Sequence, residues 1–259
     1  MIHPESKLAK TLASGAVAKG IEFFAGNVTM VEVADKVGFD FCMIDQHLSA
    51  FSLETIERMI EAARSYGMLP FVRVMNSEPY NINRILNMGV QGIIVPDVDT
   101  PEMAKDVVAS LTFQPVGKRM ACPMIRAIDY GLKPWKEYAD TEAKYIASAV
   151  LIESELAVKN IDAIAATPGL DVILLGITDL ALNLGIPGAN FTHPVMKECL
   201  RKTGEACRKN NLVMFTTTGA NADPEYLDML SRESKMLCLS SDMTLFGKAC
   251  KRLINYKEM

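Results

Sequence analysis

The chain has 259 residues, of which 49% are hydrophobic, enough to bury a large core in one α/β barrel or in two smaller domains. The 27 Lys and Arg residues are scattered and the formal net charge is -4, so nucleic acid is not an expected partner. Residues 1–15 lack the apolar region of a signal peptide, and no apolar run approaches the roughly 20 residues of a membrane-spanning helix, so we expect a cytoplasmic protein without a membrane partner.

The cysteines show no CxxC spacing, and several lie inside apolar segments. Buried free thiols are therefore expected rather than zinc ligands or disulfides. The six residues are Cys42, Cys122, Cys199, Cys207, Cys238 and Cys250.

Eight short β-rich runs alternate with amphipathic stretches along the chain, and no sequence repeat accompanies the alternation. The predicted strands are residues 20–24, 39–45, 69–74, 90–96, 148–153, 170–176, 211–217 and 235–240. The predicted helices are residues 29–38, 52–67, 80–89, 100–111, 155–167, 193–210 and 224–234. Gly38, Gly67 and Gly89 close three of these helices, where a residue free to adopt positive φ commonly ends a helix.

Near-continuous apolar strands separated by helices predict a parallel sheet that is covered by helices. Eight such units in this length predict a closed (β/α)8 barrel, the TIM-barrel fold, as one domain over residues 1–259. A doubly wound open sheet is the alternative, but no GxGxxG follows the first strand. Residues 97–147 exceed one helix and predict an extended loop and helix insertion between strands four and five. Its basic segment 117–135, which includes Arg126, would favour an acidic substrate or would be a solvated surface loop.

Chemistry in such a barrel belongs at the carboxyl ends of the strands, where the following loops form the open face. Polar residues stand at most of these ends: Glu22, Asp45, His47, Arg73, Asp97, Glu153, Asp179 and Asp242. Several carboxylates on one face repel one another unless a cation lies among them, so we expect a bound divalent metal. Glu153 and Asp179 are the predicted ligands of Mg²⁺, Mn²⁺ or Co²⁺, because oxygen ligands suit these ions. The alternatives are a local salt bridge for Glu153 and a helix N-cap role for Asp179.

Arg73 ends an apolar strand and brings a permanent cation to the mouth of the barrel. We expect it to bind a substrate carboxylate or a developing enolate oxygen, or to form an internal ion pair with Asp45 or Glu153. His193 precedes a proline and is expected to start a helix, which leaves His47 as the histidine near the predicted site.

The segment GITDL begins at Gly176, where the helix after strand six is expected to start. Backbone N–H groups at such a point can hold a carboxylate, so the main chain at Thr178 and Asp179 is predicted to bind a small anion. A short loop followed by a capped helix would have the same sequence.

Several segments match a known family in order and spacing: VEVADKVGFDFCMID, FSLETIERMIEAAR, FVRV, RILNMGVQGIIVPDVDTPEMAK, QPVGKR, LIES and LLGITDLALNLGIPG followed by HP. From about Gly15 to Phe246 the chain resembles the HpcH/HpaI aldolase family, which contains divalent-metal-dependent aldolases. The resemblance implies an enzyme that makes or breaks a bond at the α-carbon of a pyruvate-like 2-oxo acid through an enolate, with an aldehyde or an oxo acid as acceptor. It also implies a homo-oligomer, a hexamer or trimer of dimers, in which neighbouring subunits complete the site.

The resemblance assigns roles to residues of this chain. Glu153 and Asp179 would bind the metal, which chelates the keto acid through its carbonyl and carboxylate groups. Arg73 would contact the keto oxygen and stabilise the enolate, and Asp45 would support metal-bound water. Backbone amides between Gly176 and Asp179 would receive the substrate carboxylate.

The chain departs from the family at the acid/base pair. In the D-x-E-H-x-x-x-S segment usual in the family, ungapped alignment from Asp45 puts His47 at the glutamate and Leu48 at the catalytic histidine. Asn87 replaces the aspartate with which a neighbouring subunit partners that histidine. Further departures are Leu151 for a glutamine, Glu22 near a usual tryptophan and Ile177 for a proline.

The altered pair leaves two hypotheses. In the first, a one-residue shift of the loop lets His47 act as the acid/base group, and aldolase chemistry is kept. In the second, the enolate-forming half is kept and the acceptor half has changed, as in a condensing, citrate-synthase-like relative or a non-catalytic barrel that binds metal and keto acid. We favour aldolase chemistry.

Overall fold

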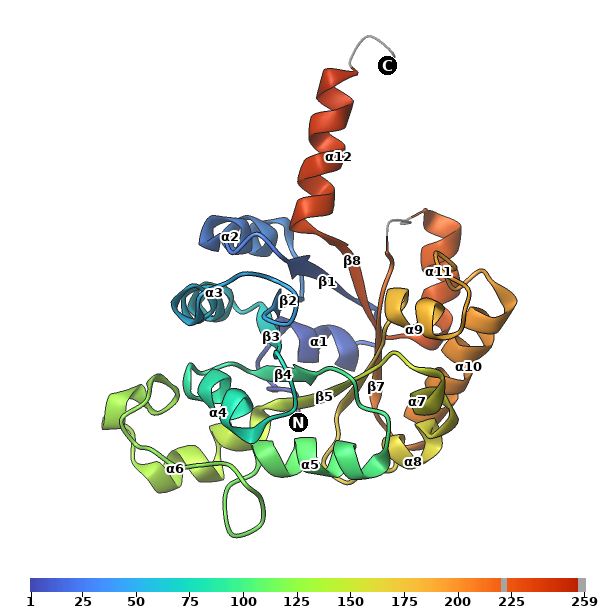
Figure 1. Cartoon of the computed structure of the whole chain (residues 1–259). Helices are drawn as coiled ribbons and strands as arrows, with labels where there is room; N and C mark the ends of the chain where they lie inside the picture. The colour runs from blue at the N-terminus through green and yellow to red at the C-terminus, as the bar shows by residue number, and fades with distance from the viewer. Residues whose placement is uncertain (220–222, 256–259) are drawn as a thin grey trace.

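The computed structural model describes residues 1–219 and 223–255, so residues 220–222 and 256–259 of the predicted domain lie outside the described residues. Parallel strands form one closed barrel in sequence order, and β8 pairs with β1 to close it (Figure 1). The strands are β1 (Ala18–Phe23), β2 (Phe41–Asp45), β3 (Leu69–Arg73), β4 (Gly92–Val95), β5 (Ala147–Ile152), β6 (Val172–Leu175), β7 (Val213–Thr217) and β8 (Met236–Ser241). The predicted (β/α)8 fold is confirmed, because each of the eight predicted strands overlaps the strand of the same rank.

Helices follow the strands and cover the outside of most of the barrel (Figure 1). They are α2 (Val28–Val37), α3 (Leu53–Tyr66), α4 (Pro79–Asn87), α5 (Pro101–Leu111), α7 (Glu155–Lys159), α8 (Ile161–Ala165), α9 (Thr178–Asn183), α10 (Pro194–Lys209), α11 (Pro224–Glu233) and α12 (Asp242–Ile254), with α1 (Lys7–Ala13) ahead of β1. All predicted helices are present, although the one predicted over residues 155–167 is divided into α7 and α8. The sequence did not predict α1 or α12.

The ends of the helices follow from local chemistry. The Ser52 hydroxyl accepts the N–H of Thr55 and caps α3, and the His193 ring accepts the N–H of Val195 at the start of α10, as expected for this histidine. Gly67 ends α3 with a φ of 86°, a conformation that costs a residue with a Cβ more than it costs glycine.

The inside of the barrel is filled by side chains that alternate with those packed under the helices. Phe41, Phe71 and Phe215 meet there with ring centroids 5.1 to 6.5 Å apart. Gly20 and Gly92 provide the room, because a Cβ at either position would lie 2.3 Å from a ring carbon of Phe41 or Phe71. Aromatic side chains of β2, β3 and β7 thus fill the inside of the barrel.

The segment between β4 and β5 contains α5, a 3-10 helix η1 (Arg126–Gly131), α6 (Trp135–Asp140) and a 3-10 helix η2 (Glu142–Tyr145). Arg119 is 2% exposed, and its guanidinium carbon lies 4.3 Å from the ring centroid of Phe113 and 5.6 Å from that of Tyr138. This arginine therefore packs the insertion together and is not available to a substrate.

Arg126 lies away from the mouth of the barrel. Its Nε donates to Glu57 of α3 at 2.9 Å, and it lines an open pocket of about 610 Å³ together with Gly67 and Gln91, which precede β3 and β4. The amino-terminal ends of the strands form that side of the barrel. Within one chain Arg126 therefore lies away from the predicted site, as the surface-loop alternative expects, and its role toward an acidic substrate stays a prediction.

The last described helix, α12, stands out from the barrel (Figure 1). Its large apolar side chains are exposed: Met243, Leu245, Phe246, Leu253 and Ile254. None of the helices in residues 1–219 and 223–255 has the length and apolar character needed to cross a membrane. The six cysteines are free, as expected, and Cys42, Cys199, Cys207 and Cys238 are buried.

Candidate active site

Four strands bring charged side chains to the mouth of the barrel. Successive residues of a strand point to opposite sides, so an inward apolar residue is followed two positions later by another inward residue. The inward pairs are Gly20 and Glu22, Met43 and Asp45, Phe71 and Arg73, and Leu151 and Glu153. The alternation that buries the apolar interior therefore also places three carboxylates and one guanidinium above it.

Asp45 is fully buried and its carboxylate is saturated with donors. Oδ1 accepts the Arg73 Nε at 2.6 Å and the N–H of His47 at 3.3 Å. Oδ2 accepts the N–H of Leu48 at 2.9 Å and the hydroxyl of Ser49 at 3.1 Å. Asp45 therefore fixes both the guanidinium of Arg73 and the loop after β2. The internal ion pair expected as an alternative for Arg73 is present.

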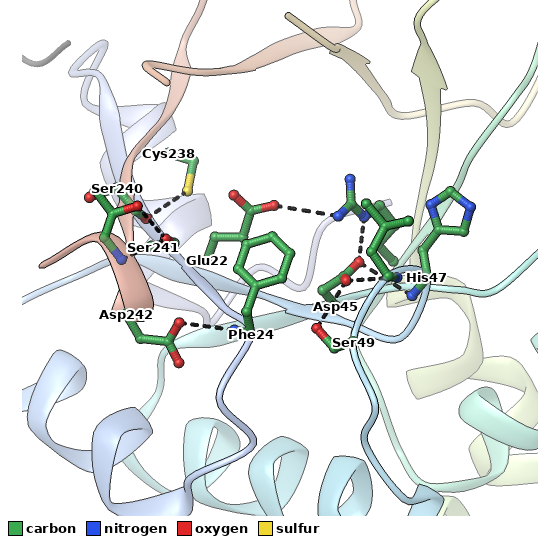
Figure 2. A network of polar contacts seen from close by, with 12 residues as sticks. Glu22, Phe24, Asp45, His47, Ser49, Cys238, Ser240, Ser241 and Asp242 are labelled. Carbon is green, nitrogen blue, oxygen red and sulfur yellow. Dashed lines mark hydrogen bonds and ion pairs between the residues drawn. The ribbon is translucent and has the colours of Figure 1, made fainter. Parts of the chain in front are cut away.

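Glu22 of β1 approaches Arg73 from the other side. Its Oε1 lies 3.8 Å from Arg73 Nη2, and the two side chains are only 15% and 11% exposed. Figure 2 shows the Glu22 carboxylate and His47 on opposite sides of Asp45. Burial raises the pKa of Glu22 to about 7, the nearby Arg73 opposes this, and the charges of Asp45 and Asp242 add to it. Glu22 is thus a carboxyl group that titrates near neutrality.

Glu153 follows β5 and lies among other carboxylates. Its Oε1 accepts the N–H of Asp97 at 3.1 Å, and Asp97 adopts a positive φ of 57°. Burial raises the pKa of Glu153 to about 7; the hydrogen bond from Asp97 lowers it, the charges of Asp97 and Asp179 raise it, and Arg73 lowers it. The predicted metal ligands Glu153 and Asp179 are therefore close enough for their charges to interact, and Arg73 is part of the same cluster.

Asp179 is exposed in the first turn of α9, whose N-cap is Ile177, so the alternative N-cap role for Asp179 is wrong. The Gly176 N–H donates to the Ile152 carbonyl at 2.9 Å and is not free to bind a substrate. A Cβ on Gly176 would lie 3.2 Å from the Glu153 Cβ and 3.5 Å from its Oε2. Glycine at this position therefore keeps open the space beside the Glu153 carboxylate.

The donor set suits a divalent cation. The charges of Asp97 and Asp179 raise the pKa of Glu153, and a cation beside these carboxylates would oppose that effect. Carboxylate oxygens are ligands that Mg²⁺ and Mn²⁺ prefer. Within the described ranges 1–219 and 223–255, no group of three or more His, Cys, Asp or Glu side chains is arranged to hold a metal ion by itself. Water or substrate oxygens would therefore have to complete the coordination.

The residues of the altered acid/base pair have unused polar atoms. His47 is half-buried, and its Nδ1 is buried without a hydrogen-bond partner in the described part of the chain. Oδ1 of Asn87, at the end of α4, is buried in the same way, whereas Leu48 is 69% exposed at the mouth.

Two residues to which the sequence gave no role have a closer relation to the site than the sequence indicated. Glu22 forms an ion pair with Arg73, and Asp97 bonds Glu153 through its main chain. Glu22 lies two positions after Gly20 on the same strand, and this alternation was the signal that its side chain faces the mouth. The positive φ of Asp97 was not readable, because no glycine or asparagine marks that turn.

A barrel whose mouth carries a buried aspartate bound to an arginine, near a carboxylate cluster, has an arrangement typical of an enzyme active site. The sequence profile of the family described as HpcH/HpaI aldolase/citrate lyase matches residues 23–246, and the chain belongs to this family. The predicted family and its class of enzyme, the carbon–carbon lyases, are confirmed.

The relatives include both aldolases and a citrate synthase. The chain is 31% identical over 249 residues to a 5-keto-4-deoxy-D-glucarate aldolase of Escherichia fergusonii, which covers 96% of this chain and 95% of that protein. Among solved structures, an HpcH/HpaI aldolase from Desulfitobacterium hafniense superposes with a TM-score of 0.86 at 27% identity, covering 96% of each chain. The citrate synthase SbnG superposes with a TM-score of 0.82 at 25% identity, again over 96% of each chain.

Proposed function

We propose that this chain is an aldolase that makes or breaks a carbon–carbon bond at the α-carbon of a pyruvate-like 2-oxo acid through an enolate. The observation that carries the proposal is the guanidinium of Arg73, held by Asp45 at 2.6 Å and charge-coupled to Glu153. Such an arrangement offers a fixed cation to a developing oxygen anion and an acidic place for a metal. The second substrate would be an aldehyde or an oxo-acid acceptor.

Glu153 and Asp179 are the side chains proposed to hold the metal, with Mg²⁺, Mn²⁺ or Co²⁺ as candidates. When bound, the cation would supply Lewis-acid chemistry that lowers the cost of forming a carbanion next to a carbonyl group.

The chain's own residues would position the keto acid. Arg73 would face the keto oxygen and stabilise the enolate, and Asp45 would keep the guanidinium in that orientation. The backbone N–H groups of Thr178 and Asp179, in the first turn of α9, would bind the substrate carboxylate. Gly176 would leave room for that carboxylate beside Glu153.

His47 is the proposed acid/base group for the acceptor hydroxyl. Its Nδ1 has no partner in the described part of the chain, and its backbone is anchored to Asp45. An imidazole near neutrality can accept the hydroxyl proton in the cleavage direction and return it in the condensation direction.

Calorimetry tests the proposed function without knowledge of the acceptor. Pyruvate and its analogue oxalate should bind the protein in Mn²⁺ and should not bind without a divalent metal. The Mn²⁺ form should also exchange the methyl protons of pyruvate for deuterium in D₂O, measured by NMR. Absence of metal-dependent binding would refute the proposal, and binding without exchange at several pH values would instead indicate a non-catalytic barrel.

A condensing enzyme is the second candidate, and the joint change of Leu48 and Asn87 on the acceptor side supports considering it. The structural likeness to the citrate synthase SbnG agrees with it without favouring it over the aldolase. A condensing enzyme would exchange the methylene protons of oxaloacetate and would fail to cleave 4-hydroxy-2-oxo acids. Mass spectrometry of both reactions distinguishes the two candidates.

A homo-oligomer, a hexamer or trimer of dimers, also belongs to the proposal, as does a cytoplasmic location. The 13-residue helix α12 stands out from the barrel with Phe246, Leu253 and Ile254 62%, 73% and 79% exposed. A helix of this length is marginal in water without packing on one face, so a neighbouring subunit would cover it. Light scattering on the purified protein should give a mass several times that of one chain.

A further inference from the structure

Glu22 is a charged inward residue of the mouth that the proposed function has not used. It lies two positions after Gly20 on β1, so its side chain continues the inward row of that strand. Its carboxylate forms an ion pair with Arg73 at 3.8 Å. Glu22 and His47 lie on opposite sides of Asp45 (Figure 2). Its place is thus beside the cation proposed to bind the keto oxygen.

The backbone that carries Glu22 is fixed from the opposite end of the chain. Asp242, the first residue of α12, accepts the N–H group of Phe24 at 3.0 Å (Figure 2). It also accepts the N–H group of Ala25 at 3.0 Å. The same carboxylate accepts its neighbour Met243 N–H at 2.7 Å. Asp242 therefore holds the main chain after Glu22 in place. Asp45 holds the guanidinium of Arg73.

Glu22 differs from these two aspartates. In residues 1–219 and 223–255 its carboxylate accepts no hydrogen bond, and its ion pair with Arg73, at 3.8 Å, is longer than a hydrogen bond. The charged and titratable groups that face it are Arg73 from β3, Asp45 from β2, Asp242 from α12 and the buried Cys238 thiol from β8. A buried carboxyl group with unused oxygens in a catalytic mouth is available for proton transfer.

The reaction requires two proton transfers on different atoms. One moves between the acceptor hydroxyl and a base, and the other moves between a base and the α-carbon of the 2-oxo acid. In the direction of deprotonation, the C–H bond breaks, its electron pair enters the enolate, and the proton passes to a carboxylate oxygen. Since the α-carbon is two bonds from the keto oxygen, a group beside Arg73 is near that carbon when the oxygen lies against the guanidinium.

We propose that Glu22 exchanges the proton with the α-carbon of the 2-oxo acid, while His47, on the other side of Asp45, serves the acceptor hydroxyl. This inference rests on the proposed function and names the second acid/base group of the same site. A pKa near 7, produced mainly by burial, gives Glu22 both protonated and ionised forms at neutral pH, as a group that works in both directions needs.

The substitution Glu22→Gln tests the inference, because glutamine keeps the shape and cannot take the proton. With saturating Mn²⁺, the rate of pyruvate methyl exchange in D₂O should fall at least about 100-fold. Calorimetry should give a pyruvate affinity near that of the unsubstituted protein. Glu22→Asp should restore part of the exchange. The matched control is Glu54→Gln on the outer surface of α3, where the side chain is 71% exposed, and it should leave both measurements unchanged.

The pH profile separates proton transfer from a structural role. The exchange rate of the unsubstituted protein should rise as pH increases through about 7, because the ionised carboxylate is the base, and Glu22→Gln should lack this limb. Exchange that persists within a few-fold in Glu22→Gln would overturn the inference. A parallel loss of pyruvate binding and exchange would also overturn it, since Glu22 would then only hold Arg73. Failure of the proposed function looks different, because the unsubstituted protein itself would not bind pyruvate with Mn²⁺.

Discussion

The two sides of the barrel mouth differ in how completely their polar atoms are used. On the Arg73 side, Asp45 is fully buried and accepts hydrogen bonds from the guanidinium, two backbone N–H groups and a hydroxyl. On the acceptor side, His47 Nδ1 is buried without a partner in the described part of the chain, and Leu48 is exposed.

This contrast has a physical meaning. Buried polar groups normally have hydrogen-bond partners, so unsatisfied ones point to a substrate, an ordered water or another subunit. The carboxylate of Asp45 is fully hydrogen-bonded within one chain, whereas Nδ1 of His47 needs a partner from outside the described residues. This difference agrees with the sequence. The residues proposed to form the enolate, such as Arg73, match the family, whereas Leu48 on the acceptor side departs from it.

The largest expected effect is on the Arg73 side of the mouth. Arg73→Ala removes the cation proposed to face the enolate oxygen, and pyruvate methyl exchange should fall by about 10²–10³-fold. NMR of the Mn²⁺-loaded protein in D₂O measures this rate. Arg58→Ala, which breaks only the exposed pair with Glu54, is the matched control and should exchange normally. Exchange that survives in Arg73→Ala would remove the basis for distinguishing the two sides.

The second effect is on stability. Asp45→Asn removes the charge that balances Arg73, and the free energy of unfolding should fall by about 3 kcal/mol, as expected when one partner of a buried pair is lost. Urea unfolding followed by circular dichroism measures it. Asp106→Asn, which breaks the exposed pair with Lys118, should change the free energy by less than about 1 kcal/mol. Equal effects of the two substitutions would mean that Asp45 does not organise the mouth.

The third effect is on the acceptor side. His47→Ala should lower the rate of cleavage of a 4-hydroxy-2-oxo acid by about 10²-fold, because the acceptor hydroxyl loses its base. The free energy of unfolding should stay within about 0.5 kcal/mol, since the lost Nδ1 has no partner in the described residues. A coupled assay for the released 2-oxo acid measures cleavage. If cleavage and exchange are both unchanged, His47 is a bystander.

The smallest effect concerns pH and metal. The pKa of Glu153 is about 7 in the folded chain against an ordinary value of 4.5, so its stabilising contribution is complete below 4.5 and is lost as pH rises through about 7. Without metal, the free energy of unfolding should therefore decline between pH 5 and pH 7.5, and Glu153→Gln should reduce the decline. Glu22 adds a contribution of the same sign. Mn²⁺ should stabilise the protein more at pH 7.5 than at pH 5, because it competes with a proton for the Glu153 carboxylate. The reverse order would argue against Glu153 as a metal ligand.

Much of the fold was predictable because its signals are local. Apolar runs of strand length, separated by amphipathic stretches, predicted the eight strands in their order. The helices α1 and α12 were missed, since α1 is a short helix in an N-terminal segment and the exposed apolar residues of α12 do not form a buried face of the barrel. Division of the chain into a single domain over residues 1–259 stays a prediction.

The site was predictable in part. Residues at the ends of strands were placed at the mouth by the two-residue alternation, and this holds for Asp45, Arg73 and Glu153. The position of Arg126 was not predictable, because its loop turns toward the amino-terminal ends of the strands through contacts with Glu57 of α3. Glu22 was visible as a polar strand end in an inward position, but the sequence did not give its 3.8 Å ion pair with Arg73.

The sequence by itself determined which residues form the strands and which of them face inward, because both follow from periodicity along the chain. Tertiary structure decided which carboxyl groups have donors and which titrate near neutrality. Asp242 bonds the backbone of Phe24 across 218 residues of sequence, and the burial of Glu22 exists only when β8 pairs with β1. Hydrogen-bond partners and desolvation depend on closure of the barrel, and no local pattern in the sequence records them.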